Sequence, residues 1–434
     1  ENNLHETITG MADAYIGSNN IPLFFRGGAY GTRSEGGKDA AQARYLFTKF
    51  DALTRHIFKE EDDPLLQHLE DDGEKVEPKY YVPIIPMALV NGTLGIGTGW
   101  SSTIPCFDPT DIISAIKVWL EHDGKVIDRQ GEHPVSLLPH LRPWYRGHKG
   151  DMQYDEKKNR YMSLGKMERI GENKVHITEL PVGLWTNKFV EHLETLKEEK
   201  KITSFKNHST PTVIDFTVIE NSSTECDEKL LKLSKPISMT NLVLFTEEGK
   251  LKRFESVDEI IDSFCHARYP YYFKRKAYML KDMEKKIKYL GNKKRFLEEV
   301  RDGEIKLFEM VGKKRQSRKT SDIVAELEEK GYDKEEEGED EEKSEEDEET
   351  EEKKERKSGH GYEYLLKMQI SSITAEKINK LKNDIASNIE ARDELQGTSE
   401  KQLWIKDLDD FEKAYQSWLV DMSKEKLIKK KPKK

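Results

Sequence analysis

The spacing of apolar residues changes near residue 256 and separates two kinds of structure. Beyond it, apolar residues recur every three or four positions in two stretches, as in amphipathic helices. They are Ala277, Leu280, Met283, Ile287 and Leu290 in the first stretch, and Ile378, Leu381, Ile385 and Ile389 in the second. With a compact apolar and basic segment between them (300–330), they favour an antiparallel coiled coil with a globular tip. Two ordinary bundle helices are the alternative.

Residues 84–250 carry shorter patterns in which strands and helices alternate. The runs IIPMALV (84–90) and KVHITEL (174–180) are rich in β-forming residues and are bounded by Gly, Pro and Asn. The run LVLFTEEGKLKRF (242–254) predicts a hairpin that turns at Glu247-Glu248-Gly249. Helices are predicted over 109–121 and 185–199. This zone is therefore predicted to be α+β.

The first 83 residues combine helical spacing with a glycine-rich loop. Segment 8–16 predicts a helix that ends near the stop signal Gly17-Ser18-Asn19-Asn20. Segment 40–58 also reads as a helix, because Leu53, Ile57 and Phe58 follow Tyr45 or Leu46 at helical spacing. Acidic turns are expected at 60–64 and 70–74.

The net charge of −10 comes from an acidic insert in a chain that is otherwise mildly basic. Residues 333–352 hold 15 acidic residues and 2 lysines, a net −13, which leaves +3 for the remainder. Nucleic-acid binding is therefore not excluded. We expect 333–357 to be disordered, because its like charges repel and nothing apolar offsets the entropy of ordering. The tail KKKPKK (429–434) fits a fragment of a nuclear-localisation signal or a solvated end.

The apolar runs, the cysteines and the first residue also bear on the class of protein. No apolar run approaches the ~20 residues of a membrane helix, so we expect no membrane association. The three cysteines lie far apart, which argues against a structural zinc site and suits a reducing compartment. They are Cys106, Cys226 and Cys265. The first residue is Glu1 and not Met, so we expect a piece of a longer polypeptide.

The first candidate site is GGAYGTRSEGGKDAAQARY (27–45). Its glycines let backbone N–H groups approach a ligand, and Arg33, Lys38 and Arg44 supply cations suited to phosphates. A phosphate-binding loop and a solvated basic loop both remain open. The phenol of Tyr45, with an ordinary pKa of ~10, is a poor nucleophile at neutral pH, although an adjacent guanidinium favours the phenolate. Residue types alone disfavour Tyr45 as a nucleophile.

The second candidate is NGTLGIGTGW (91–100), which matches neither a dinucleotide-binding fingerprint nor a Walker loop. Ile96 lies between two glycines and could wedge between base steps. Spacing alone favours a buried isoleucine in a tight turn. The third candidate is PWYRGHKG (143–150), where Arg146 and Lys149 lie beside aromatic residues, a weak sign of contact with a phosphate backbone.

One candidate for metal binding is the sequence Asp407-Leu408-Asp409. It lies on an amphipathic stretch with Phe411 and Tyr415, and a solvated helix face explains it better than a metal site. If the protein transfers phosphoryl groups with Mg²⁺, we expect the metal ligands to lie outside this sequence.

Taken together, the motifs resemble the breakage–rejoining region of type IIA DNA topoisomerases of the eukaryotic kind, also found in large DNA viruses. The resemblance covers essentially the whole chain, and its longest motif spans 76–101. The motifs are YIGSNN (15–20), YGTRSEGGKDAAQARYLFT (30–48), VEPKYYVPIIPMALVNGTLGIGTGWS (76–101), ITELPVGLWT (177–186), ESVDEIIDSFCHARYPYYFKRKAYML (255–280) and the segment around YEYLLKM (362–368).

The resemblance implies an α+β multidomain fold. Residues 1–83 would be the C-terminal half of a winged-helix domain, 84–250 an α/β tower, and 251–434 the coiled coil with its exit-gate dimer interface. Tyr45 would be the nucleophile that joins the 5′ end of a broken DNA strand, and Arg44 would hold the scissile phosphate. Ile96 would intercalate and bend the DNA, while Arg33 and Lys38 fall in a DNA-contacting loop.

The resemblance also implies partners and cofactors. The family uses ATP and Mg²⁺, and its ATPase module and metal-binding TOPRIM domain precede the region that this chain resembles. We expect a homodimer on double-stranded gate DNA, in the nucleus or, for a virus, in the viral factory or virion. We expect the chain to be inactive alone, because its acidic metal ligands would come from the TOPRIM domain. Two rivals remain: a non-catalytic protein that binds DNA and dimerises, and a phosphodiesterase whose tyrosyl intermediate is hydrolysed.

Overall fold

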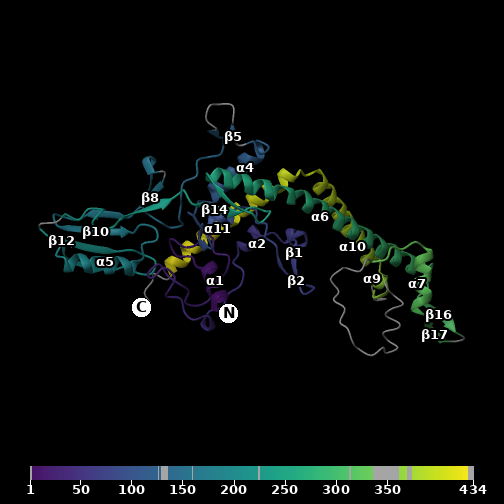
Figure 1. Cartoon of the computed structure of the whole chain (residues 1–434). Helices are drawn as coiled ribbons and strands as arrows, with labels where there is room; N and C mark the ends of the chain where they lie inside the picture. The colour runs from purple at the N-terminus through teal and green to yellow at the C-terminus, as the bar shows by residue number, and fades with distance from the viewer. Residues whose placement is uncertain are drawn as a thin grey trace. The chain divides into compact units, whose positions relative to one another are not determined.

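The computed structural model describes residues 2–125, 127–128, 135–158, 160–222, 225–311, 314–335, 361–368 and 374–428. Most of the predicted acidic disorder (336–357) and the basic tail (429–434) lie outside these residues. The described chain forms two compact units, 1–272 with 400–434, and 273–399 (Figure 1). The α+β prediction is confirmed. Among the described residues, no helix has the length and apolar character to cross a membrane.

The N-terminal part of the first unit consists of short helices and strands together with the longer helix α4 (Pro109–Glu121). They are α1 (Asn2–Ala12), η1 (Ala43–Tyr45), α2 (Thr54–Ile57), η2 (Glu60–Leu65), β1 (His68–Asp71), β2 (Glu74–Pro78), α3 (Met87–Val90), β3 (Thr93–Gly97), β4 (Trp100–Ile104), α4 (Pro109–Glu121), β5 (Ile127–Asp128) and β6 (Val135–Ser136). The predicted helix over 109–121 is confirmed: the carboxylate of Asp108 caps it by accepting the Thr110 amide at 2.9 Å.

The sheets of the first unit follow. Their elements are β7 (Met152–Asp155), η3 (Glu156–Lys158), β8 (Arg160–Leu164), β9 (Lys166–Arg169), β10 (Lys174–Glu179), α5 (Thr186–Glu198), β11 (Ile202–Asn207), β12 (Phe216–Glu220), β13 (Ser234–Ser238), β14 (Leu242–Phe245) and β15 (Leu251–Phe254). An antiparallel sheet of order β11-β12-β10-β9 carries α5 on one face (Figure 1). The predicted strand at 174–180, helix at 185–199 and hairpin at 242–254 are confirmed.

Three helices close the main core of the first unit. Trp119 of α4, Tyr272 at the end of this unit's part of α6 (Val257–Arg301) and Trp404 of α11 (Glu400–Ile428) are buried together. The rings of Tyr272 and Trp404 stack at 5.3 Å between centroids. Burying such large aromatic surfaces dominates the stability of a core.

The second unit is an antiparallel helix pair with a small tip. The remainder of α6 runs beside α10 (Ala375–Gly397), because Leu297 packs with Ile378 and Leu381 while Lys276 donates to the Thr398 carbonyl at 2.7 Å. The predicted antiparallel pairing is thus confirmed within this unit. The tip holds β16 (Phe308–Val311), β17 (Lys314–Ser317), α7 (Thr320–Glu329) and α9 (Glu363–Leu366).

Three predictions of local structure are corrected. The predicted helix over 40–58 is wrong: only η1 and the single turn α2 form, and between them the chain is extended and pairs Phe47 with Gly27 and Phe50 with Phe24. The hydrogen bonds of this pairing satisfy backbone groups that a helix would otherwise have paired. The predicted strand at 84–90 is wrong, because α3 forms there directly after Pro86, a residue that favours helix starts.

The predicted helix over 8–16 is displaced towards the N-terminus. It covers Asn2–Ala12 as α1, and the chain then turns through Gly17 at a φ of 93°. A positive φ of this size is one that glycine adopts without steric penalty, so the stop signal acts several residues beyond the helix end.

Candidate active site and nucleic-acid interface

Tyr45 is a surface residue. It ends the 3₁₀ turn η1, where its amide donates to the Gln42 carbonyl at 2.9 Å, and 65% of it is exposed. The guanidinium carbon of Arg44 lies 5.0 Å from the centroid of its ring. A phenol held in water beside a permanent cation can reach an anionic ligand, whereas a core aromatic cannot.

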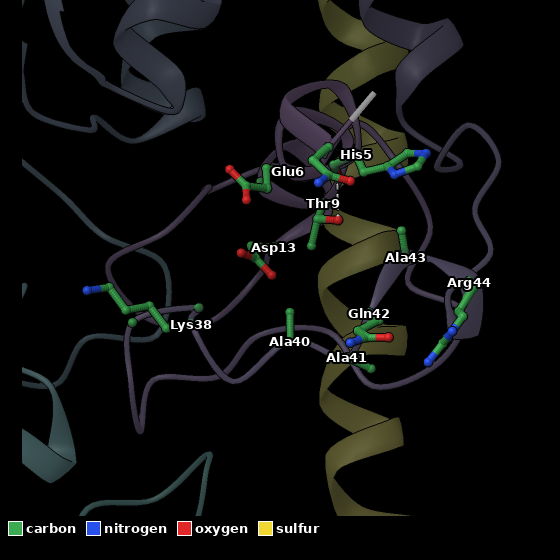
Figure 2. Close-up of a pocket in the computed structure, with 14 residues that line it drawn as sticks. His5, Glu6, Thr9, Asp13, Lys38, Ala40, Ala41, Gln42, Ala43 and Arg44 are labelled. Atoms are coloured by element: carbon green, nitrogen blue, oxygen red, sulfur yellow. Dashed lines mark hydrogen bonds between the residues drawn. The ribbon is translucent and has the colours of Figure 1, made fainter.

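A cavity of about 970 Å³ lies between α1 and the loop that leads to Tyr45 (Figure 2). It is lined by Asn2, His5, Glu6, Thr9, Gly10, Asp13, Gly36, Gly37, Lys38, Ala40, Ala41, Gln42, Ala43 and Arg44. Lys38 and Arg44 come from opposite ends of the loop segment, and both are exposed. The loop thus offers backbone groups between two cations, an arrangement that suits a phosphate.

Asp13 is a buried acid that lines this cavity. It is 7% exposed, and among the described residues none donates a hydrogen bond to its Oδ1. Burial raises the pKa of Asp13 to about 6, an effect that Arg26 opposes and Asp39 reinforces. Burial likewise raises the pKa of the neighbouring Tyr15 to about 12. Sequence reasoning missed Asp13, because nothing in its local pattern indicates burial of a charge.

Arg33 is buried, unlike Lys38 and Arg44 of the same loop. It is 4% exposed, and its Nη2 forms an ion pair with Glu179 Oε1 at 2.5 Å and donates to the Leu180 carbonyl at 2.9 Å. The guanidinium is therefore used inside the protein and does not face a solvent-accessible ligand. The partner carboxylate lies far along the chain, so the burial of Arg33 could not be read from the loop sequence.

Ile96 projects from the tip of a hairpin formed by β3 and β4. The strands pair in register from Thr93 with Ile104 to Gly97 with Trp100, and Ile96 is 93% exposed. The expectation of a buried isoleucine in a tight turn is therefore wrong. On the opposite face, Ser102 and Ile104 are buried, so one face of the hairpin is packed and the other is open.

Leu94 shares the open face with Ile96, because residues two apart in a strand point the same way. It is 87% exposed. Sequence reasoning missed it, although the alternation of Leu94 and Ile96 with glycines could have indicated a paired apolar projection. Such side chains suit insertion between base steps.

Arg146 and Lys149 differ in their surroundings: Arg146 is bonded within the protein, and Lys149 faces solvent. Arg146 donates from Nε to the Asn20 carbonyl at 2.7 Å and from Nη2 to the Ala14 carbonyl at 2.9 Å, and its guanidinium carbon lies 5.0 Å from the centroid of the Trp418 ring. Burial lowers the pKa of Arg146. This side chain holds the fold together, while Lys149 is exposed.

The carboxylates of Asp407 and Asp409 on α11 are bound to protein groups. Asp407 accepts the Tyr272 hydroxyl at 2.9 Å and lies 3.4 Å from Lys59 Nζ. Asp409 pairs with Lys117 at 2.8 Å. Within the described part of the chain, no three His, Cys, Asp or Glu side chains gather in a way that could hold a metal ion.

Residues 1–409 match the family of the DNA gyrase/topoisomerase IV A-subunits. The mitochondrial DNA topoisomerase 2 of Dictyostelium discoideum is 36% identical over 94% of this chain and 29% of its own length. That of Invertebrate iridescent virus 6 is 37% identical over 71% of this chain and 26% of its own. The chain thus spans less than a third of these relatives.

Among solved structures, the chain is similar to the DNA-binding, cleavage and re-ligation domain of Plasmodium falciparum topoisomerase II. The TM-score is 0.83 at 34% identity, and the alignment covers 98% of this chain and 56% of that one.

Proposed function

Because the chain belongs to the family of the DNA gyrase/topoisomerase IV A-subunits, we propose that it is the DNA breakage–rejoining part of a DNA topoisomerase II. The observation that carries this proposal is the exposed Tyr45, stacked with Arg44 beside a cavity whose rim holds Lys38. The whole enzyme would break a duplex transiently, pass a second duplex through the break and reseal it, which changes supercoiling and separates linked circles.

In the proposed reaction, Tyr45 Oη attacks a phosphorus atom of the DNA backbone. A bond forms between Oη and phosphorus while the bond from phosphorus to the 3′ oxygen breaks; the phenol loses its proton and the 3′ oxygen gains one. The product is a 5′-phosphotyrosyl linkage and a 3′ hydroxyl. Arg44 would stabilise the charge of the five-coordinate phosphorus. Attack by the 3′ hydroxyl reverses the exchange without further fuel, because the tyrosyl ester retains the bond energy.

The proposed DNA contacts are divided between two surfaces. Lys38 and Lys149 would contact phosphates, and Ile96 would enter between base steps and bend the duplex. Arg33 and Arg146, committed to internal bonds, would support these surfaces from within. We retain the division into a winged-helix half (1–83), a tower (84–250) and a coiled coil with exit gate (251–434) as part of the proposal.

The family implies Mg²⁺ and ATP, and the residues described here do not fit a metal site. We therefore assign both cofactors to TOPRIM and ATPase parts of the same enzyme, and we assign no step to them on this chain. We also propose a homodimer through the exit gate. The proposed location is the nucleus, or the viral factory or virion for a viral source; a relative named as mitochondrial adds a third compartment.

The test is the variant Tyr45→Phe in the complete enzyme. Loss of the phenolic oxygen should abolish DNA-linked protein trapped by SDS while leaving the Kd for DNA within a few-fold, because the ring remains. Tyr81→Phe is the matched control, since Tyr81 is also 61% exposed in the first unit. Adducts that persist in Tyr45→Phe would refute the assignment.

A second measurement distinguishes a topoisomerase from the phosphodiesterase alternative. Cleaved plasmid should return to closed circles after chelation or heating, whereas hydrolysis of the tyrosyl ester would leave permanent breaks. A protein that binds DNA and dimerises but never yields adducts would be the non-catalytic alternative.

A further inference from the structure

A buried ion pair joins the loop that precedes Tyr45 to the four-stranded sheet. The side chains of Arg33 and Glu179 are 5% and 2% exposed and lie 2.5 Å apart. Glu179 ends β10, and its Oε1 also accepts the Leu180 amide at 2.9 Å while Oε2 accepts the Lys149 amide at 3.2 Å. A carboxylate held by two amides and a guanidinium has a fixed position and orientation.

His148 borders this pair without adding a second charge. Its Nδ1 lies 3.9 Å from Glu179 Oε2, and its Nε2 lies 3.5 Å from Ser163 Oγ. Burial lowers the pKa of His148, an effect that Glu179 opposes and Arg33 reinforces. The imidazole is thus neutral near pH 7, and Arg33 is the cation that balances Glu179.

The same loop is fixed to the start of α5 by its backbone. The carbonyls of Arg33 and Ser34 accept the amides of Thr186 and Asn187 at 3.4 and 3.1 Å. Asn187 Nδ2 also donates to Glu35 Oε1 at 3.0 Å. The ion pair therefore belongs to a docking contact between the loop and the sheet domain, and its two charged side chains are buried in that contact.

We propose that Arg33 is a positioning residue: its ion pair with Glu179 fixes the loop from which Lys38, Arg44 and Tyr45 reach the DNA. The inference rests on the proposed function for its effect on cleavage and goes beyond it in assigning Arg33 and Glu179. The reacting phenol is then placed relative to the sheet as well as to α1. Breaking one half of the pair leaves a buried charge without its counter-ion, which the loop can relieve only by moving.

The first test is amide hydrogen exchange of the chain with Glu179→Gln. Gly37 and Ala41 donate to the carbonyls of Thr32 and Ala29 within the loop, so their amides report its order. We expect them to exchange about tenfold faster than in the unaltered chain. Glu220→Gln is the matched control, because Glu220 lies on β12 of the same sheet and pairs with Arg169 at 3.0 Å. The control should leave the exchange rates of the Gly37 and Ala41 amides unchanged.

The second test measures cleavage in the complete enzyme. At saturating DNA, Glu179→Gln should form SDS-trapped adducts at least about tenfold more slowly, with the Kd for DNA within twofold, because misplacement of a reacting group slows chemistry more than binding. A double variant, Arg33→Met with Glu179→Met, distinguishes a positioning role from a purely stabilising one. This variant removes both charges, so it should recover thermal stability while adduct formation stays slow.

The outcomes distinguish the two proposals. Unchanged loop exchange and adduct rate in Glu179→Gln would overturn the positioning role, and so would a double variant that recovers the adduct rate with its stability. If even the unaltered enzyme forms no adduct while Glu179→Gln speeds loop exchange, the positioning of the loop stands and the proposed function fails. If Glu179→Gln does not fold, the double variant with Arg33→Met and Glu179→Met takes its place, because it leaves no unpaired charge. Faster exchange at Gly37 and Ala41 together with slow adduct formation would support the positioning role, and unchanged values of both would overturn it.

Discussion

At the scale of single residues, exposure separates Tyr45 from the tyrosines that support the fold. Burial raises the pKa of Tyr15 and of Tyr364 to about 12, so ionising either phenol is costly. Tyr45 lies in water with the Arg44 guanidinium against its ring. A nucleophile that must approach a bulky polyanion needs both access and a nearby cation, and the 3₁₀ turn at 43–45 supplies them together.

The buried carboxyl of Asp13 predicts how the free energy of unfolding depends on pH. Its pKa of about 6 lies above the ordinary 3.8, so between pH 4 and 6 the folded state binds more protons than the unfolded state. The free energy of unfolding should therefore fall as the pH rises through this window, by on the order of 2 kcal/mol. Asp13→Asn should remove the fall and be more stable than the unaltered chain at pH 7.

Urea denaturation at pH 4, 5, 6 and 7 measures this effect. Glu6→Gln, at an exposed position of the preceding helix α1, is the control and should follow the unaltered chain. An Asp13→Asn chain whose stability retains the same dependence between pH 4 and 6 would rule out Asp13 as its source.

Single residues also mark the limit of reasoning from sequence. The identity of Tyr45 and Arg44 came from the resemblance of long motifs, since a phenol beside an arginine is by itself an ordinary pair. The burial of Arg33 could not be predicted, because its partner Glu179 comes from a strand that meets the loop only after folding. Cations in a glycine-rich loop look alike in sequence whether they face DNA or a buried carboxylate.

At the scale of elements, regular helices and strands with one dominant periodicity were predictable. The helices α4 and α5 and the hairpin β14–β15 formed where the spacing placed them. Segment 40–58 failed because its apolar residues are not a helix face: Phe47 and Phe50 are 69% and 56% exposed, and the backbone pairs with the chain near Gly27. Contacts with a distant segment overrode local periodicity there.

The β3–β4 hairpin carries the next prediction. Ile96→Ala should reduce the bending of bound DNA, because the wedge that separates base steps is shortened, while the packed face of Ser102 and Ile104 keeps the hairpin folded. Energy transfer between dyes at the ends of a short duplex measures the bend. The control is Leu251→Ala on the neighbouring hairpin, where Leu251 is 43% exposed. An unchanged bend in Ile96→Ala would exclude the wedge.

At the scale of the whole molecule, charge is distributed unevenly between segments. The chain carries −10, yet without 333–352 it carries +3. Long-range attraction of DNA depends on this distribution, because the field of the whole protein governs the approach of a polyanion. Exposed charges act over about 10 Å at 0.1 M salt and farther at lower ionic strength. The acidic segment should therefore weaken DNA binding most where screening is least.

Replacing 336–352 by a glycine–serine segment of equal length tests this consequence. The segment holds 13 acidic residues and one lysine, so its replacement takes the net charge from −10 to +2. We expect DNA affinity at 20 mM salt to rise on the order of tenfold, and the gain to shrink towards zero at 200 mM salt as screening removes the repulsion. Fluorescence anisotropy with a labelled duplex measures both affinities. A gain of the same size at both salt concentrations would mean that the segment blocks DNA by occupying its site, and equal affinities at 20 mM would mean that its charge does not reach the DNA at all.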